Sequence, residues 1–410
     1  MKGFSTKAVH GKALRKDPHG SLRFPLYDSV AFEQESARDI QFAFEGRKPS
    51  HTYSRITNPS VEDFEQRINL LSDSLGVVAV SSGMAAISNL ILTVAESGSN
   101  IISTKFLFGN TYSLFEKTLK PWGLNVRYIN MNDMDMLRNS INEKTRAIFL
   151  EIITNPQLQV PDMKEISKVA MEYSVPLVVD GTLTTSYIFK SKDFGVSVEV
   201  LSSTKYISGG ATTVGGLIVD NGTFNWEKCP KLEVSVKKYG EFALVTKLKR
   251  EVYRNLGACL SPHNAYLQTL GLETLSLRID KSCSNTLRIS EYLEKCEKVK
   301  SVNYPGLKAS KYHEIAKAQF KDKFGGILTF ELGDKEMCFA FMDRLKLIKR
   351  ATNLNDNKTL ILHPASTIFC EYTLEEKKEM GVSESMLRLS VGIEDVEDII
   401  EDINLGLEGI

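Results

Sequence analysis

The chain has 410 residues, with 51 basic and 51 acidic side chains, so its formal net charge is zero. This length allows two or three domains, and 42% hydrophobic with 25% charged residues is ordinary for a folded globular protein, which argues against a disordered chain. A neutral total gives no electrostatic reason to expect nucleic acid or an anionic membrane as a partner.

Targeting and cysteine patterns point to the cytoplasm. No run of about 18 apolar residues occurs, and the N-terminal sequence MKGFSTKAVHGKALRKDPHG has no apolar centre, so we expect neither a membrane span nor a signal peptide. The six cysteines form no C-x-x-C pair, and no histidine stands at metal-finger spacing from them. This pattern argues against a disulfide framework and against a metal site, and we expect free, mostly buried thiols.

Residues 1–60 are predicted to form an N-terminal arm. Prolines and glycines interrupt residues 1–58, and so long an irregular segment is usually functional or wraps a neighbour. A helix is predicted to begin after it, because Pro59 leads to Ser60 as N-cap, with Asp63 three residues on in a weak form of the capping box. One face of this helix is apolar and consists of Val61, Phe64, Ile68, Leu71 and Leu75.

Residues 61–255 are predicted to form one large α/β domain. Short apolar runs alternate with helical segments such as MAAISNLILTVAES and MKEISKVAMEYS. Strands without polar alternation are buried on both faces, as in a mainly parallel sheet covered by helices. Seven such runs predict a seven-stranded sheet: 77–81, 101–104, 125–129, 147–152, 176–180, 198–202 and 213–219.

Residues 256–410 have a different pattern of predicted helices and strands. A long helical pattern with few breaks covers 262–296, and strand-like runs follow at 325–331 and 386–391, with helical segments between them and at the end. This proportion of strands and helices predicts a smaller C-terminal α+β domain.

Two predicted turns carry side chains suited to a bound ligand. The turn Ser81–Ala86 follows a strand and opens a helix, where free backbone N–H groups and the helix dipole favour an anion, although such a turn is more often a plain connection. Asp180 ends a buried strand. A carboxylate there is costly unless it is paired, so it is a cap, a metal ligand or the partner of a cationic ligand.

Two further segments add cations. Lys205 lies just past a buried strand, among hydroxyl side chains and before Gly209 and Gly210. A lowered pKa would make its amine a nucleophile there, although most single lysines are ordinary surface residues. Tyr53 and Arg55 stand two residues apart in the arm, where an arginine can clamp a phosphate or remain a solvated loop charge.

Together these four segments are typical of one kind of cofactor site. A phosphate cradle, a strand-end acid and a hydroxyl-flanked lysine are the groups that bind pyridoxal phosphate, in which the acid keeps the pyridine nitrogen protonated. At this point the sequence resembles the Cys/Met-metabolism family of pyridoxal-phosphate enzymes, in the aspartate-aminotransferase fold type, over nearly its whole length. The segments that carry the resemblance are YSRITNPS, SSGMAA, SSTKYISGG and MLRLSVGIE.

The resemblance implies roles for residues that hold the cofactor. Lys205 matches the lysine that binds pyridoxal 5′-phosphate covalently. Ser202 and Thr204 match hydroxyls that bind its phosphate, and Gly83 and Met84 match the backbone part of the same cradle.

Further implied roles concern the ring and the substrate. Asp180 matches the partner of the pyridine nitrogen, and Asn155 matches a residue near the ring hydroxyl. Arg388 matches the arginine that holds the substrate α-carboxylate, with Thr359 assisting at the place of a family serine.

The resemblance also implies an oligomer. Tyr53 and Arg55 match the pair that reaches the phosphate of the neighbouring subunit, so we expect a dimer at least and a homotetramer built as a dimer of dimers.

Two positions depart from the family pattern. The family usually has V-D-N-T at the acid, and this chain has Gly181 after Asp180. The family tyrosine that stacks on the ring is Phe108, so stacking is retained but the hydroxyl is lost, and its acid–base work must move to Lys205, another side chain or water.

The similarity is greatest to the O-acetylhomoserine sulfhydrylase branch, from the segments 155–162, 260–265 and 271–278 and from the lack of a cysteine around Gly109. Phe108 agrees, because acetate leaves with little acid help whereas a thiolate benefits from a proton donor. We therefore expect a transferase of methionine biosynthesis that replaces acetate by sulfide, or by carrier-delivered sulfur, to give homocysteine. A cystathionine γ-synthase, a methionine or cystathionine γ-lyase, and a non-catalytic paralogue acting as a binding protein stay open as alternatives.

Overall fold

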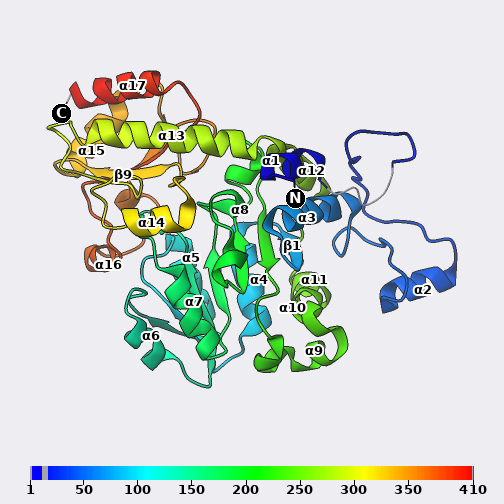
Figure 1. The fold of residues 1–410 in the computed structure, drawn as a ribbon. Helices are drawn as coiled ribbons and strands as arrows, with labels where there is room; N and C mark the ends of the chain where they lie inside the picture. Colours follow the sequence, from blue (N-terminus) through cyan, green and yellow to red (C-terminus); the bar gives the residue numbers. More distant parts are fainter. Residues whose placement is uncertain (1, 12–16, 409) are drawn as a thin grey trace.

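The computed structural model describes residues 2–11, 17–408 and 410. Figure 1 shows a large body of strands and helices, a smaller body that contains the C-terminus, and an N-terminal arm that leads away from both. This arrangement agrees with the predicted α/β class and with the smaller α+β part at the C-terminus. The exact domain limits at 60/61 and 255/256 stay predictions.

The large body is built on a seven-stranded sheet of order β1-β7-β6-β5-β4-β2-β3. β7 runs antiparallel to both of its neighbours, β1 and β6, and the other pairs of this sheet are parallel, so the predicted mainly parallel sheet is confirmed. The strands are β1 Gly76–Val80, β2 Asn100–Ser103, β3 Asn125–Tyr128, β4 Thr145–Glu151, β5 Leu177–Asp180, β6 Val198–Leu201 and β7 Gly216–Asp220.

Register brings the functional strand ends together. Glu151 on β4 pairs with Asp180 on β5, and Asp180 in turn pairs with Val200 on β6. Because these three strands are parallel, their carboxyl ends meet at one edge of the sheet, which is where ligands bind in open α/β sheets.

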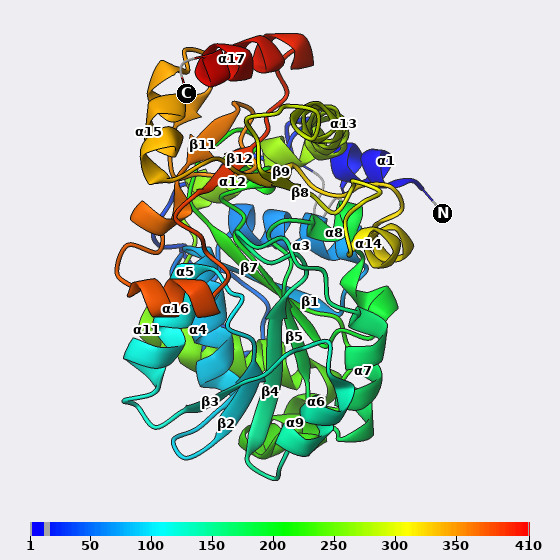
Figure 2. The same ribbon diagram turned by 90° about the vertical axis from the view of Figure 1, so that its left-hand side faces the viewer.

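Helices cover both faces of this sheet (Figure 2). One core contains apolar side chains of α3 (Pro59–Ser72), α7 (Met163–Glu172) and α12 (Pro262–Glu273), and the other contains those of α4 (Gly83–Val94). The remaining helices of this body are α5 Gly109–Ser113, α6 Met134–Ser140, α8 Thr185–Ile188, α9 Glu233–Tyr239, α10 Ala243–Lys247 and α11 Tyr253–Leu256, with π-helical turns at Leu114–Leu119 and Leu248–Val252.

The start of α3 corrects the predicted cap. Asn58, not Ser60, is the N-cap, because the Asn58 side chain accepts the backbone N–H of Ser60. Asp63 is not part of a capping box and instead pairs with Arg67 at 2.9 Å.

The smaller body has a five-stranded sheet of order β10-β11-β12-β9-β8. The predicted strands near 325–331 and 386–391 are β9 and β12. The elements are β8 Ser301–Asn303, β9 Ile327–Glu331, β10 Lys349–Arg350, β11 Leu360–Leu362, β12 Met386–Ser390, α13 Leu275–Leu293, α14 His313–Phe320, α15 Lys335–Arg344, α16 Leu374–Glu379 and α17 Val396–Glu408.

The long helical pattern at 262–296 is two helices in the structure. It breaks at Thr274, whose backbone is not helical, between α12 and α13. The break has a packing reason, because α12 lies against α3 of the large body whereas α13 lies against α17 of the small one.

The arm is less irregular than its prolines indicate. It contains α1 (Phe4–His10), which packs against α3, α12 and α13, and α2 (Ala37–Glu45), none of whose residues is buried. Figure 1 shows α2 standing well away from the body.

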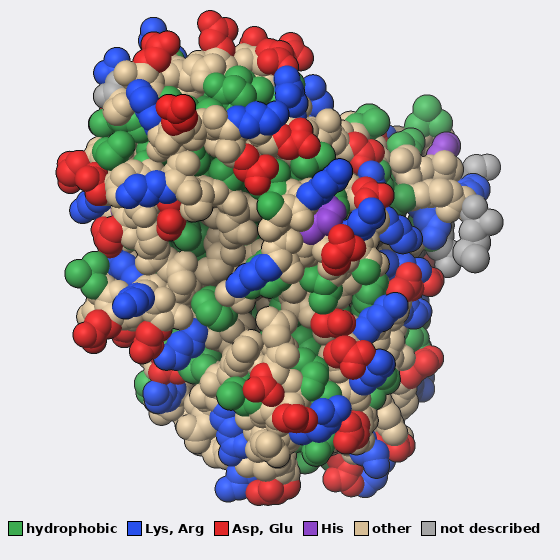
Figure 3. Space-filling model, turned by 60° about the vertical axis from the view of Figure 1, so that its left-hand side comes forward, with side chains coloured by type: hydrophobic (Ala, Val, Ile, Leu, Met, Phe, Trp, Pro, Cys, Tyr) green, Lys and Arg blue, Asp and Glu red, His purple; other side chains and the backbone are tan. Residues whose placement is uncertain are grey.

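Surface and cysteine chemistry are unremarkable. Acidic and basic side chains are interspersed on the face seen in Figure 3. The six cysteines are free, and three of them, Cys229, Cys283 and Cys338, are buried. Within the described residues, no helix is both long and apolar enough to cross a membrane, and no three His, Cys, Asp or Glu side chains are grouped to hold a metal ion.

Candidate active site

A cavity of about 460 Å³ lies at the carboxyl ends of β4, β5 and β6, with residues of the small body closing it. Parallel strands deliver their polar ends to this edge, so residues far apart in sequence share the cavity. Nine of the predicted site residues line it: Gly83, Met84, Phe108, Asn155, Asp180, Ser202, Thr204, Lys205 and Arg388.

Lys205 follows β6 and points its ammonium group into the cavity. Its Nζ donates to Oδ1 of Asn353 at 2.7 Å. Burial and the nearby Arg388 lower the pKa of Lys205 to about 8, against the opposing effect of Asp356. The lowered pKa makes the neutral amine, which a nucleophile or base requires, easier to form near neutral pH than in an ordinary lysine.

Arg388 is a second cation of the cavity. It lies on β12 with 2% of its surface exposed, and its Nη1 and Nη2 donate to Oδ1 of Asn155 at 3.0 Å and to the carbonyl of Asn353 at 3.1 Å. Its buried Nε has no partner. Burial lowers the pKa of Arg388 to about 10, so it stays a cation at neutral pH and is available for a carboxylate.

The predicted phosphate cradle is present at the start of α4. Ser82 caps this helix through the N–H of Ala85, at 3.0 Å, which leaves the first N–H groups of the helix to a ligand. A Cβ on Gly83 would stand 2.7 Å from Cβ of Ser202, so only glycine lets the two loops approach this closely. Thr204 binds Gly215 through its hydroxyl and holds the second loop in place.

Asp180 and Glu151 form a pair of acids on adjacent strand ends. Asp180 accepts the N–H of Thr182 at 2.8 Å. Glu151 accepts the N–H of Phe108 at 2.6 Å and that of Asn155 at 3.0 Å. Burial raises the pKa of both carboxyl groups, and the neighbouring Asp180 raises that of Glu151 further, so the site favours a cation beside them.

Three predicted residues lie elsewhere. Thr359 is fully buried, and its hydroxyl donates to Glu394 at 2.9 Å and accepts the N–H of Gly392 at 3.0 Å, so its role beside the substrate stays a prediction. Tyr53 and Arg55 do not line the cavity of their own chain. Arg55 donates to the carbonyl of Arg254, 2.5 Å away, so the role of this pair across an interface stays a prediction.

Two site residues were missed in the sequence. Glu151 had a signal of the kind used for Asp180, an acid that ends a buried strand. Asn353 had none, because it lies in a loop and meets Lys205 only through the fold.

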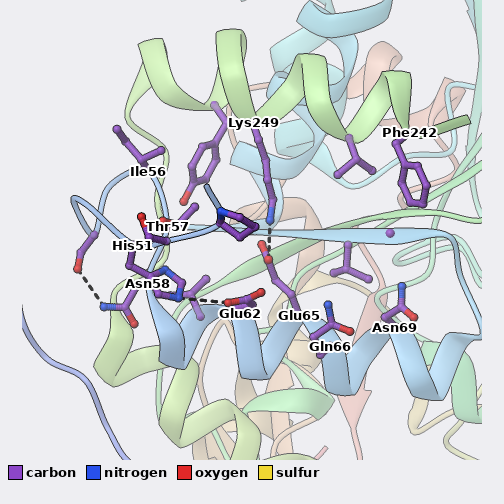
Figure 4. Close-up of a pocket in the computed structure, with 18 of the residues that line it drawn as sticks. His51, Ile56, Thr57, Asn58, Glu62, Glu65, Gln66, Asn69, Phe242 and Lys249 are labelled. Atoms are coloured by element: carbon purple, nitrogen blue, oxygen red, sulfur yellow. Dashed lines mark hydrogen bonds and ion pairs between the residues drawn. The ribbon is translucent and has the colours of Figure 1, made fainter. Parts of the chain in front are cut away.

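A second cavity, of about 380 Å³, lies between the arm, α3 and the segment around Lys249 (Figure 4). His51 lies 3.3 Å from Glu62 there, and Lys249 pairs with Glu65 at 2.6 Å. These charges are paired within the chain, and the cavity holds none of the residues predicted for chemistry.

The first cavity fits pyridoxal phosphate. The N–H groups at a wall too narrow for a Cβ would hold its phosphate, the strand-end acids would pair with its pyridine nitrogen, and the lysine of lowered pKa would bind its aldehyde. Fold and site therefore define a pyridoxal-phosphate enzyme. The family model for Cys/Met metabolism PLP-dependent enzymes matches residues 5–408, and the chain belongs to this family, whose cofactor is pyridoxal phosphate.

Individual relatives support both fold and family. An O-acetylhomoserine sulfhydrylase structure from Wolinella succinogenes is 47% identical, with a TM-score of 0.77, and the match covers 86% of this chain and 98% of that one. A Campylobacter jejuni structure named as an O-acetylhomoserine (thiol)-lyase is 31% identical, with a TM-score of 0.91, over 99% and 100% of the chains, and carries N′-pyridoxyl-lysine 5′-monophosphate. An L-methionine gamma-lyase from Fusobacterium nucleatum is 35% identical over 100% of this chain and 98% of its own.

Proposed function

We propose that this enzyme is an O-acetylhomoserine sulfhydrylase, which replaces the acetate of O-acetylhomoserine by sulfide, or by sulfur delivered on a carrier, and releases homocysteine. The likeness to the W. succinogenes enzyme supports the branch. The observation that carries the choice of reaction is Phe108, which lines the cavity where a family tyrosine would supply a hydroxyl. Acetate is a weak base that departs with little acid help, so this substrate loses least from the missing hydroxyl.

The chain's own residues divide the work as follows. Arg388, oriented by Asn155, holds the α-carboxylate of the substrate. Lys205 would hold the cofactor through its Nζ, and the same amine, whose pKa is lowered, would accept and return the α-proton of the substrate. When bound, pyridoxal phosphate supplies an electron sink for the carbon beside it. Asp180 keeps the ring nitrogen protonated, which makes that sink effective.

Four groups hold the phosphate in this proposal. They are the N–H groups of Gly83 and Met84 and the hydroxyls of Ser202 and Thr204, all of which line the cavity. In the C. jejuni structure the modified lysine stands at position 205 of its own chain, which supports the same assignment for Lys205 here.

A second candidate is a γ-lyase or γ-synthase that uses the same site with water or another thiol. The likeness to an L-methionine gamma-lyase at 35% identity favours keeping it. A non-catalytic binding protein is disfavoured, because Lys205, Asp180 and Arg388 all face one cavity.

Product analysis with separate substrates distinguishes a sulfhydrylase from a γ-synthase and a γ-lyase. The purified enzyme is given O-acetylhomoserine, O-succinylhomoserine or methionine, each with sulfide, cysteine or no thiol, and homocysteine, cystathionine and 2-oxobutyrate are measured. A sulfhydrylase gives mainly homocysteine from O-acetylhomoserine with sulfide. Dominant cystathionine would indicate a γ-synthase, and dominant 2-oxobutyrate from methionine would indicate a γ-lyase.

We also propose an assembly and a location. The arm residues Tyr53 and Arg55 lie outside their own chain's cavity and are assigned to the phosphate of a second subunit, in a dimer or a dimer of dimers. Free cysteines fit the reducing cytoplasm, which we propose as its location.

A further inference from the structure

A loop of the small body, residues 351–359, joins β10 to β11 and borders the cavity. Two hydrogen bonds fasten it. The backbone N–H of Asn355 donates to the hydroxyl of Ser390 on β12 at 2.7 Å, and the side chain of Asn357 donates to the carbonyl of Gly209 at 3.1 Å. The loop is therefore anchored both to the sheet of the small body and to the segment that follows the cavity lysine.

Within this loop, the amide of Asn353 is held at both of its ends. Its Oδ1 accepts a hydrogen bond from Nζ of Lys205 at 2.7 Å, and its Nδ2 donates one to Oδ2 of Asp356 at 3.1 Å. The other carboxylate oxygen of Asp356 accepts the backbone N–H of Lys358 at 3.2 Å, so both oxygens are fixed. A line of hydrogen bonds thus joins Asp356 to the lysine through one amide.

The carboxylate of Asp356 decides which way this amide faces. A carboxylate only accepts hydrogen bonds, so the amide turns its NH2 group toward Asp356 and leaves Oδ1 to face Lys205. In the reverse orientation the NH2 group of Asn353 would meet the ammonium group, donor against donor. The two ends of a primary amide have nearly the same size, so shape alone does not select between these orientations.

We propose that Asp356 is a positioning residue: through the amide of Asn353 it presents a hydrogen-bond acceptor to Nζ of Lys205 and holds the ammonium group in place in the cavity. The proposal rests on the assignment of Lys205 as the residue that takes the cofactor. Asp356 does not line the cavity, so it acts on the lysine through Asn353 and not by touching cofactor or substrate.

The charges around Lys205 give the sign of the effect. Burial and Arg388, from β12, lower the pKa of Lys205 to about 8, and Asp356 opposes them. The strand-end acids Glu151 and Asp180 line the same cavity. Loss of the Asp356 carboxylate removes a group that favours the ammonium form, and a reversed amide would disfavour that form, so both changes lower the pKa of Lys205 further.

The pH dependence of cofactor attachment tests this role. The full chain is stripped of cofactor, pyridoxal phosphate is added between pH 6 and pH 9, and the rate of covalent attachment is followed by absorbance. The neutral amine is the nucleophile, so the rate should rise to a plateau as Lys205 loses its proton. The cofactor's own ionisations are common to all variants, so the variants are compared by the fraction of the plateau rate that each reaches at pH 6.5.

Asp356→Asn keeps the shape of a half-buried side chain and removes its charge. We expect the fraction at pH 6.5 to rise about threefold, because a lower pKa leaves more of Lys205 neutral there. An unchanged or lower fraction would overturn the proposal.

Asn357→Ala is the matched control. It releases the loop from the carbonyl of Gly209 but leaves the contact between Asp356 and Asn353, so its fraction at pH 6.5 should equal that of the wild type. A rise equal to that of Asp356→Asn would mean that only the anchoring of the loop matters, and would overturn the proposal.

A double variant shows whether Asp356 acts through Asn353. If it does, Asp356→Asn should raise the fraction clearly less in an Asn353→Ala background than in the wild type, because the amide that carries the effect is gone. An equal rise in both backgrounds would mean that the carboxylate acts on Lys205 only as a distant charge, which would overturn the positioning role.

Borohydride reduction and peptide mass spectrometry of each variant locate the attachment. Attachment at a different lysine would refute the cofactor site itself, and this proposal with it. Attachment at Lys205 with a profile that Asp356→Asn does not move would leave the site assignment intact and refute the role of Asp356 alone.

Discussion

The ammonium nitrogen of Lys205 lies 2.7 Å from Oδ1 of Asn353, and the backbone carbonyl of the same asparagine accepts a hydrogen bond from Arg388. One loop residue thus contacts both cations of the cavity. It fixes the spacing between the lysine proposed to move the substrate proton and the arginine proposed to hold the substrate carboxylate.

Asn353→Ala should therefore slow turnover more than it weakens the fold. A hydrogen bond to a charged group contributes about 1.5–3 kcal/mol, so we expect kcat to fall roughly 10- to 100-fold. Steady-state kinetics measure the effect. Asn357→Ala is the control, because Asn357 lies in the same loop and binds the carbonyl of Gly209 instead. Equal losses in both variants would make Asn353 merely structural.

Lys205→Ala should abolish covalent attachment of the cofactor. The yellow absorbance of the purified enzyme should disappear, and turnover should fall by about 10³-fold or more, since both the attachment and the proton-transfer group are removed. Borohydride reduction of the wild type followed by peptide mass spectrometry should place the modification on Lys205. Modification of another lysine would refute the site assignment.

Asp180→Asn keeps the shape of the acid but removes its charge. We expect turnover to fall about 10²- to 10³-fold and cofactor affinity to weaken, because a buried charge pair loses one partner. Asp180→Ala should bind cofactor more weakly still. Absorbance titration and initial rates measure the two effects, and wild-type turnover in Asp180→Asn would contradict the role.

Much of this site was accessible from sequence because its signals are local. An uninterrupted apolar run identifies a buried strand; Asp180 ends one of these strands and Lys205 lies four residues past another. Parallel strands must then bring those ends together. Resemblance to the family added Arg388, which no local pattern distinguishes from other arginines.

Other features of the site could not be predicted from the sequence, because they depend on tertiary packing. Asn353 reaches Lys205 from 148 positions away, and no periodicity encodes that meeting. Thr359 was assigned by analogy with a family serine, whereas its hydroxyl is used inside the small body by Glu394 and Gly392. Likewise, Gly181 was visible as a departure from the pattern, but its reason, the Glu199 carboxyl that a Cβ there would meet, required the structure.

Stability of the cofactor-free chain should fall as pH rises from about 4 to about 7. Burial raises the folded-state pKa of Glu199 and Asp220 to about 7, so the folded state binds more protons than the unfolded one in this interval. Stability from these groups is complete below their ordinary pKa values and is lost on the way to pH 7.

Thermal unfolding at pH 5 and pH 8 measures this loss. Glu199→Gln and Asp220→Asn should each gain stability relative to wild type at pH 8 compared with pH 5, by an amount on the order of a few kcal/mol at most. Parallel pH profiles for wild type and both variants would contradict the raised pKa values.

Mixing two inactive variants tests whether each site draws on two chains. Arg55→Ala removes the phosphate contact proposed to cross the interface, and Lys205→Ala removes the lysine inside. In a mixed dimer one site carries both substitutions and the other carries neither, so activity returns although each parent variant is inactive. Random exchange makes half of the dimers mixed, so recovery should approach about a quarter of wild-type activity at most.

Mixing Asp180→Ala with Lys205→Ala is the control and should restore no activity, because both residues line the cavity of one chain. If subunit exchange is demonstrated but the mixture with Arg55→Ala stays inactive, Arg55 serves the active site of its own chain and the argument for a shared site fails.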